Sequence, residues 1–168
     1  IIFIGPSEKA IILMGDKIKS KMIAEKASVN VVPGFIGEIN NVNHAKKIAK
    51  KIGFPVIVKA SAGGGGKGMR IINGEEDVED AFLRASSEAK NSFGDDRLFV
   101  EKYLVEPRHI EIQIIADNYG NVVSLGEREC SIQRRNQKVI EEAPSSFLDE
   151  TLRRDMSTQA IMLAKEVE

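Results

Sequence analysis

The stretch Val56 to Gly68, V-I-V-K-A-S-A-G-G-G-G-K-G, limits the possible folds more than any other part of the chain. A short apolar run ends at Lys59, and four consecutive glycines then lead to a second lysine, Lys67. Glycines lack Cβ atoms, so their backbone N–H groups can approach an anion closely, and the lysines supply the countercharge. Strand-like runs at 55–58 and 69–72 flank the loop, which predicts the tip of a phosphate-binding β-hairpin. A flexible glycine linker is the alternative interpretation.

Three known phosphate loops can be compared with this stretch. The Walker A pattern fails, because Ser61 stands where its first glycine belongs and Gly68 where its Ser or Thr belongs. The loop contains a G-x-G-x-x-G spacing, but a Rossmann loop opens a helix, and residues 69–72 look extended. A glycine flap between two strands, as in protein kinases, fits the setting better, although kinases place their ATP lysine on a later strand.

Composition excludes several classes of protein. The net charge of −1 over 168 residues lacks the excess of basic residues that is typical of nucleic-acid-binding proteins. One cysteine and two histidines cannot form an internal disulfide or a standard zinc site, and Cys130 is interpreted as structural. No apolar run approaches the ~20 residues of a membrane helix. We therefore expect no nucleic-acid or membrane partner and a cytoplasmic location, or the mitochondrial matrix if the source is a eukaryote.

The hydrophobic pattern predicts an alternation of helices and strands, with residues 41–104 forming a compact α+β unit. Ser7, Asp16 and Asn41 are expected helix N-caps, and Asn73 with Glu76 a variant of the capping box. The expected strands are 1–4, 29–32, 56–59, 69–72, 98–104, 108–117 and 122–125, and the expected helices are 8–14, 17–27, 42–52, 74–93 and 151–168. Both ends look cut, so an internal fragment is expected.

The second of these helices should separate apolar from charged side chains. Ile18, Met22 and Ile23 are expected on its apolar side, and most of its lysines are expected in water. Lys17 lies in the first turn, an unfavourable end for a cation, so a bound anion there is conceivable.

Charged side chains interrupt the later strands. Glu101 and Lys102 lie inside the apolar strand 98–104, so they either have partners or face water from an edge strand. In 108–117, His109, Glu111 and Gln113 alternate with isoleucines, which is typical of a cleft lining or of a solvated sheet face.

Residues 127–138 are dense in hydrogen-bonding groups, although apolar segments flank them on both sides. This segment is either a surface strand or loop, or it crosses a polar cleft. Arg134, Arg135 and Lys138 are candidates for binding phosphate or carboxylate, with a solvated basic edge as the alternative.

Three segments together resemble biotin carboxylase, an ATP-grasp enzyme: A-S-A-G-G-G-G-K-G-M-R, F-V-E-K-Y-L-V-E-P-R-H-I-E-I-Q and E-R-E-C-S-I-Q-R-R-N-Q-K-V-I-E-E-A-P. The resemblance covers essentially the whole chain. The sequences R-R-N-Q-K and G-D-D-R-L look most like the alpha chain of propionyl-CoA or acyl-CoA carboxylases. The implied fold is an α+β ATP-grasp fragment. Residues 1–32 would end the N-terminal α/β domain, 33–105 would form the complete lid, and 106–168 would begin the antiparallel-sheet catalytic subdomain.

The resemblance also implies roles for individual residues. Lys17 and Lys59 match nucleotide-phosphate lysines, and Gly65 and Gly66 match the flap over the phosphates. The segment that matches the adenine-binding stretch, largely through main-chain atoms, consists of Glu101, Lys102, Tyr103 and Leu104. His109 matches a histidine of the nucleotide site. Gln133, Asn136 and Lys138 match the active-site strand, with Gln133 and Lys138 as the catalytic candidates. Many relatives have His where this chain has Asn136, which cannot titrate near neutral pH.

The reaction implied by the resemblance is phosphorylation of bicarbonate by ATP to carboxyphosphate, followed by carboxylation of biotin on a carrier domain. Mg²⁺ would bridge the phosphates, with its ligands outside this chain and no metal ligand within it. A carboxyltransferase is the implied further partner, the intact enzyme is expected to be an oligomer, and the fragment alone is expected to be inactive. Two alternatives stay open: another ATP-grasp ligase of the carbamoyl phosphate synthetase type, and a non-catalytic nucleotide-binding module.

Overall fold

A computed structural model describes residues 3–62 and 66–167, which form two compact α+β units. Unit 1 contains Ile1–Leu13, Ile23–Asn30 and Glu106–Glu168, and unit 2 contains Met14–Met22 and Val31–Val105. The helices are α1 (Glu8–Gly15), α2 (Lys17–Lys26), α3 (Val42–Ile52), α4 (Val78–Phe93) and α5 (Glu150–Val167), with a short 3₁₀ helix η1 (Glu75–Asp77). The strands are β1 (Val56–Ala60), β2 (Met69–Ile72), β3 (Leu98–Lys102), β4 (Ile110–Ala116), β5 (Val122–Arg134) and β6 (Gln137–Glu142). The α+β class expected from the sequence is confirmed; the three-part division at 32/33 and 105/106 stays a prediction.

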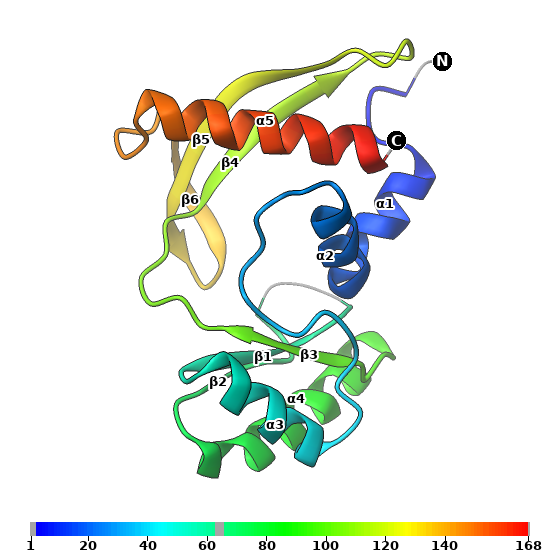
Figure 1. The fold of residues 1–168 in the computed structure, drawn as a ribbon, viewed down its shortest axis with the longest axis vertical. Helices are drawn as coiled ribbons and strands as arrows, with labels where there is room; N and C mark the ends of the chain where they lie inside the picture. The colour runs from blue at the N-terminus through cyan, green and yellow to red at the C-terminus, as the bar shows by residue number, and fades with distance from the viewer. Residues whose placement is uncertain (1–2, 63–65, 168) are drawn as a thin grey trace. The chain divides into compact units, whose positions relative to one another are not determined.

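Unit 2 is an antiparallel sheet covered on one face by two helices. The strand order is β2-β1-β3, and α3 and α4 pack side by side on one face (Figure 1). Alternate strand residues point into this core, as period-two geometry requires. The buried strand residues of that face are Val56, Val58, Ala60, Ile72, Leu98 and Val100. The glycine-rich stretch therefore joins two antiparallel strands, as the flanking runs predicted.

The chain segment before α3 covers the outer side of β3. The N–H groups of Phe35 and Ile39 donate to the carbonyls of Val100 and Leu98, at 3.0 and 2.9 Å. Gly34 pairs with Glu101, and a Cβ atom on Gly34 would lie only 2.8 Å from the Cβ of Glu101. Only glycine allows this close approach without a shift of the backbone. Consequently β3, although last in the sheet order, does not have an open edge.

Three expected helix starts are present. Ser7 Oγ accepts from the N–H of Ala10 at 3.1 Å, and Asn41 Oδ1 accepts from the N–H of His44 at 2.9 Å. Asp16 Oδ1 accepts from two N–H groups in the first turn of α2, each at 3.0 Å. These side chains satisfy backbone donors that have no partner within the helix.

Other local predictions are wrong. Residues 3–4 and 29–32 are not in strands, and both Phe3 and Ile4 are exposed, because no described strand pairs with them. The predicted capping box of Asn73 and Glu76 is absent, since the helical segment begins with η1, whose N-cap is Gly74 and has no side-chain capping hydrogen bond. The apolar side of α2 also differs, because Ile18 is buried whereas Met22 is exposed.

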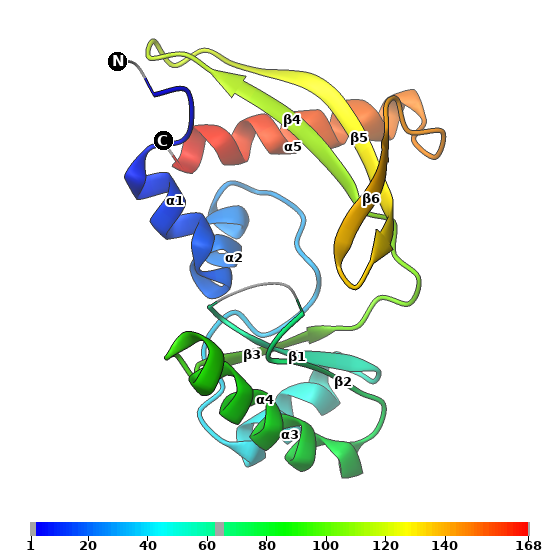
Figure 2. The same ribbon diagram turned by 180° about the vertical axis from the view of Figure 1, so that it is seen from behind.

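Unit 1 is built on a second antiparallel sheet of order β4-β5-β6, against which α5 packs along β4 and β5 (Figure 2). Glu127 of β5 is buried and accepts two hydrogen bonds from Arg153 Nε of α5, at 2.9 and 3.0 Å. Glu127 also accepts from the N–H of Ser145 at 3.0 Å. This ion pair joins the helix to the sheet.

The polar segment 127–138 forms most of a β-hairpin, β5–β6, that the sequence pattern did not specify. Its turn residues Arg135 and Asn136 have φ angles of 51° and 63°, in the left-handed region. Two such residues between antiparallel strands are typical of a type I′ turn, in which Asn is favoured. Cys130 is fully buried and unpaired, as a structural cysteine should be, and burial raises the pKa of its thiol. No helix among the described residues is both long and apolar enough to cross a membrane.

Candidate functional site

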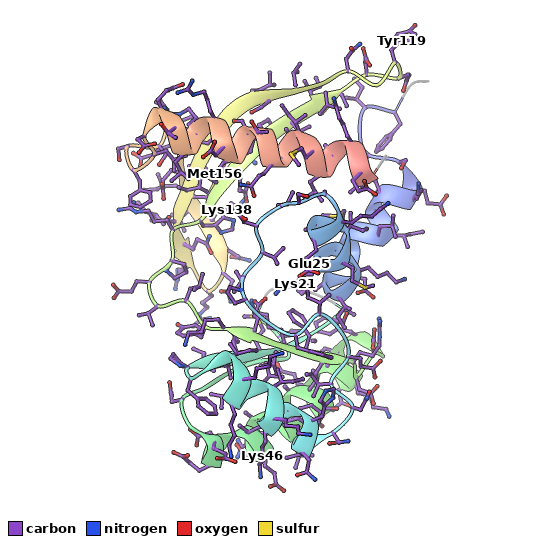
Figure 3. The ribbon with its side chains drawn as sticks, viewed as in Figure 1. Lys21, Glu25, Lys46, Tyr119, Lys138 and Met156 are labelled. Atoms are coloured by element: carbon purple, nitrogen blue, oxygen red, sulfur yellow. The ribbon has the colours of Figure 1, made fainter. Side chains whose placement is uncertain are left out.

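The residues singled out from the sequence form two groups, one in each unit. Lys17, Lys59 and the segment 101–104 belong to unit 2, whereas His109, Gln133 and Lys138 belong to unit 1. Figure 3 labels Lys138 on β6, which belongs to the unit 1 group, and Lys21 on α2, which lies four residues after Lys17 of the unit 2 group. Each group is described within its own unit.

Two members of the unit 2 group, Lys59 and Glu101, lie on the sheet face opposite α3 and α4. Ile57 pairs with Glu101 and Lys59 with Phe99 across β1 and β3, so these four side chains share one face. Lys59 and Glu101 are diagonal neighbours on this face, and their ammonium and carboxylate groups form an ion pair. The charged residues inside the apolar strands therefore have partners, and the interpretation of Glu101 as a water-exposed edge residue is wrong.

Glu101 is held by two lysines. Its Oε1 pairs with Lys59, and its Oε2 lies 2.5 Å from Lys21 Nζ. The Glu101 side chain is only 8% exposed, so it has been removed from most of its hydration. Burial opposes its charge, but the hydrogen bonds from Lys21 and Lys59 and the attraction of both ammonium groups hold its pKa below the ordinary value. Glu101 is thus a stable anion between two cations.

The start of α2 is fastened to the end of β1. The N–H of Lys17 donates to the carbonyl of Ser61 at 3.2 Å, and Ser61 Oγ donates to Asp16 Oδ1 at 3.0 Å. Arg97 Nη2 donates to Asp16 Oδ2 at 3.0 Å and also pairs with Asp95 at 2.6 Å. Despite burial, hydrogen bonds from the Lys19 N–H, Arg97 and Ser61 keep the pKa of Asp16 below its usual value.

Lys17 carries its charge in an unfavourable environment. Burial lowers the pKa of its ammonium group, repulsion from Lys59 lowers it further, and Asp16 and Glu101 oppose both effects. Two ammonium groups that repel each other beside a buried carboxylate are typical of a site that binds an additional anion. The two lysines identified from the sequence are therefore brought into one electrostatic environment.

The segment 101–104 already uses several polar groups within unit 2. The N–H of Lys102 donates to the Pro33 carbonyl at 2.7 Å, and the N–H of Tyr103 donates to the Pro55 carbonyl at 3.1 Å. Lys102 Nζ donates to the carbonyls of Gly53 and Phe54, both at 2.9 Å, just after the end of α3. A ligand held here by main-chain atoms would have to bind main-chain groups other than the N–H groups of Lys102 and Tyr103. Leu104, at the end of the segment, is exposed.

The glycine loop is described in part. Gly65 lies outside the described residues, and Gly66 has a φ of 82°. Gly68 has a φ of 66°, and a Cβ atom on it would lie 2.9 Å from the Cβ of Ala60. The N–H of Ala60 donates to the carbonyl of Gly68 at 2.9 Å, which closes the base of the loop. Glycine is therefore required at Gly68 by both backbone conformation and space.

His109 and Gln133 contact each other in unit 1. Gln133 Nε2 lies 2.6 Å from His109 Nδ1 and donates to the Cys130 carbonyl at 2.9 Å. His109 Nε2 lies 2.9 Å from Glu111 Oε1. These contacts join Gln133, His109 and Glu111 in one chain of hydrogen bonds.

Glu111 is the centre of the unit 1 group. Besides His109, it pairs with Lys138 and accepts from Arg128 Nη2 at 2.8 Å. Arg128 Nη1 also donates to Glu141 at 2.8 Å. The Lys138 hydrogen bond is the main reason that the pKa of Glu111 lies below its ordinary value, since it outweighs burial. The same bond raises the pKa of Lys138, which therefore stays a cation.

Asn136 lies apart from these contacts. It occupies the second turn position of the β5–β6 hairpin, and its φ of 63° accounts for an Asn there on backbone grounds alone. The structure also brings in residues that sequence analysis did not place in a site, namely Lys21, Asp16, Arg97, Arg128 and Glu141. Glu111 was indicated by the alternation in 108–117, but the partners of Lys21 and Arg97 lie about eighty residues away in sequence.

The described residues do not gather a metal-binding group: no cluster of three or more His, Cys, Asp or Glu occurs among them. Glu111 and Glu141, the carboxylates beside Lys138, are both bound by Arg128. Unit 2 instead offers ammonium groups around one carboxylate, and unit 1 offers a cation, an amide and an imidazole. Both arrangements suit an anionic ligand rather than a metal ion.

Comparison with known proteins identifies the family. Residues 16–168 match the model of the "Carbamoyl-phosphate synthase L chain, ATP binding domain". The chain is 59% identical over 167 residues to the propionyl-CoA carboxylase alpha chain of Ruegeria pomeroyi, covering 99% of this chain and 24% of that protein. It therefore spans about a quarter of the length of that curated relative.

Comparison with solved structures also finds biotin carboxylases. The biotin carboxylase of Campylobacter jejuni, solved as a "beta-gamma-ATP complex", has a TM-score of 0.94 at 51% identity over 99% of this chain and 37% of its own. The biotin carboxylase domain of Hydrogenobacter thermophilus 2-oxoglutarate carboxylase, in complex with MgADP, ADP and bicarbonate, has a TM-score of 0.93 at 50% identity with the same coverage. The chain therefore belongs to the family of the carbamoyl-phosphate synthase L chain ATP-binding domain, has the ATP-grasp fold of biotin carboxylases, and resembles propionyl-CoA carboxylase alpha chains in sequence.

Proposed function

We propose that this chain is part of a biotin carboxylase that uses ATP and bicarbonate to carboxylate biotin on a carrier protein. The observation that carries the proposal is the grouping of positive charge in unit 2, where Lys21 and Lys59 both pair with Glu101 and Lys59 also repels Lys17. A polyphosphate would relieve the repulsion between Lys17 and Lys59. The relatives solved with an ATP analogue and with MgADP and bicarbonate support the same conclusion.

In this proposal, unit 2 binds the nucleotide. Lys17 and Lys59 neutralise phosphate charge, and the backbone of Gly65 and Gly66 covers the phosphates. The main chain of Glu101, Lys102, Tyr103 and Leu104 holds the adenine. Negative charge shifts between oxygens as a phosphoryl group is transferred, so fixed cations and backbone donors stabilise the transition state without reorganisation.

Unit 1 would hold the bicarbonate side of the reaction. Bicarbonate oxygen attacks the γ-phosphorus and ADP leaves. The resulting carboxyphosphate breaks down to carbon dioxide and phosphate, and the ureido nitrogen of biotin attacks the carbon dioxide while its proton passes to the released phosphate. Because Glu111 keeps Lys138 protonated, Lys138 serves as a fixed cation for bicarbonate or phosphate and not as a base. Gln133 and His109 supply hydrogen bonds, and Asn136 can do so but cannot exchange a proton near neutral pH.

Magnesium would supply further charge neutralisation on the phosphates when bound. The described residues do not fit it, because their carboxylates near the candidate site are paired with arginine or lysine. No step of the mechanism is therefore assigned to a metal through this chain, and ligands from elsewhere are proposed.

The intact enzyme is proposed to act with a biotin carboxyl carrier domain and a carboxyltransferase, as an oligomer. The compartment that accompanies this proposal is the cytoplasm, or the mitochondrial matrix in a eukaryote. The isolated 168-residue chain is proposed to be inactive.

The proposal is tested by measuring ATP hydrolysis by the full-length protein encoded by the gene. Hydrolysis that requires both bicarbonate and free biotin is expected. The family description also names carbamoyl-phosphate synthase, so that ligase type is the second candidate. ATP hydrolysis that requires bicarbonate but does not change with biotin would favour the carbamoyl phosphate synthetase type. Nucleotide binding without hydrolysis would mean that the protein is a binding module only.

A further inference from the structure

We propose that Lys21 is a positioning residue that pairs with Glu101 when Lys59 turns to a nucleotide phosphate, and that it thereby sets nucleotide affinity. This inference rests on the proposed function, in which Lys59 contacts phosphate. It assigns a role to one lysine of α2, a helix whose lysines were mostly expected in water.

The two ion pairs of Glu101 are not equivalent. Lys21 is fixed from three sides: its Nζ lies 2.5 Å from Glu101 Oε2, donates to the Val32 carbonyl at 3.1 Å, and lies 5.6 Å from the centre of the Phe99 ring. The Lys21 side chain is 14% exposed, against 25% for Lys59. Lys59 also lies one residue before the end of β1, next to the glycine loop. Lys59 is therefore the partner that can turn away from Glu101.

Removing Lys59 from Glu101 would be costly without a second cation. A buried carboxylate that loses its only partner has neither water nor a countercharge, and such losses are strongly destabilising. Each oxygen of Glu101 has its own lysine, so departure of Lys59 leaves Oε2 paired with Lys21. The attraction of Lys17 for Glu101 acts in the same direction. With Lys21 present, a phosphate competes for Lys59 only with Oε1 of Glu101, because Lys21 keeps Oε2 paired.

The proposal predicts the response of ATP affinity to a cycle of substitutions in the full-length protein. Lys21→Met should raise the Kd for ATP by about tenfold or more, equivalent to about 1.4 kcal/mol, because Lys59 is then the one lysine left of the two that pair with Glu101. Glu101→Gln removes the charge that needs a partner. Adding Lys21→Met to Glu101→Gln should then change the Kd by less than about twofold. Lys21→Arg, which keeps the cation, should restore most of the affinity.

The matched control is Lys46→Met on α3, which removes an exposed pair with Glu79 at 3.3 Å and should leave the Kd unchanged. ATP binding is measured by calorimetry on variants whose thermal unfolding shows that they are folded. If Lys21→Met does not fold, the Kd values of Glu101→Gln and of the double variant still test the role of Lys21, because they should differ by less than about twofold. An unchanged Kd in Lys21→Met, or an equal loss in both backgrounds, would overturn the role of Lys21. If the unsubstituted protein binds no ATP, the proposed function is wrong and this inference falls with it.

Discussion

Glu111 and Arg128 face each other across the pairing of β4 and β5, with Arg128 Nη2 2.8 Å from Glu111 Oε2. This contact places the carboxylate between a fixed guanidinium group on one side and Lys138 on the other. It also explains how charged residues can occupy neighbouring strands: Glu111 of β4, Arg128 of β5, and Lys138 and Glu141 of β6 pair with one another.

Acid should weaken unit 1 through Glu111. Its pKa is lowered in the folded state, so this contribution to stability is complete above the ordinary value of 4.5 and is lost as the pH falls through the folded-state pKa. Glu111→Gln should therefore destabilise the protein at neutral pH, and its difference from the unsubstituted protein should shrink below about pH 4.5. Urea unfolding at several pH values measures this. A difference that is constant across this pH range would contradict the assignment.

Asp16 has two separable roles, as N-cap of α2 and as partner of Arg97. Asp16→Asn keeps an efficient cap but loses the ion pair, whereas Asp16→Ala loses both. The alanine variant should be less stable than the asparagine variant by about 1 kcal/mol, as measured by chemical denaturation. Equal stabilities would mean that the cap contributes nothing here.

The loop and the lysine at its base should act on ATP in different ways. Lys59→Ala should raise the Kd for ATP in the full-length protein by about tenfold or more, as expected for the loss of a charge-assisted contact. Gly66→Val should mainly lower kcat, because a β-branched residue is strained at a φ of 82°. The same substitution at Gly65 is predicted to impair turnover. Binding measurements together with steady-state kinetics separate the two effects; if no variant affects ATP, the loop is a linker.

The left-handed turn at Asn136 gives a test of whether its side chain takes part in catalysis. Asn136→Gly should preserve the hairpin, whereas Asn136→Val should destabilise it by about 1–2 kcal/mol because of its φ of 63°. If the side chain hydrogen-bonds to a substrate, the glycine variant should lose turnover while its thermal stability stays close to the original. Unchanged turnover would assign Asn136 to the turn alone.

Local sequence signals predicted the local features well. The β1–loop–β2 hairpin follows from apolar runs on both sides of the glycines, and the caps at Ser7, Asp16 and Asn41 follow from residue type next to a periodic run. Contacts between distant segments were beyond such signals. Nothing near Lys21 indicates a carboxylate eighty residues later, so the expectation that most lysines of α2 lie in water could not single it out.

The same limit explains the errors in the strands and the turn. Residues 29–32 have strand-like composition, but a strand forms only where a partner strand is available, and none pairs with them among the described residues. The β5–β6 turn lacks the Asn-Gly signature, because Arg135 takes the first left-handed position, where non-glycine residues are uncommon. Predicted roles for individual site residues stay predictions, whereas the fold and family are established.

The hydrogen bond from the Lys17 N–H to the Ser61 carbonyl joins two segments that are 44 residues apart in sequence. Together with the Asp16–Ser61 contact, it makes the first turn of α2 and the end of β1 a single rigid support. The backbone positions of Lys17 and Lys59 are therefore fixed relative to each other, although the Lys59 side chain can still turn. A doubly anionic inhibitor that bridges the two lysines would have to order only their side chains, because the backbone segments that carry them are already joined.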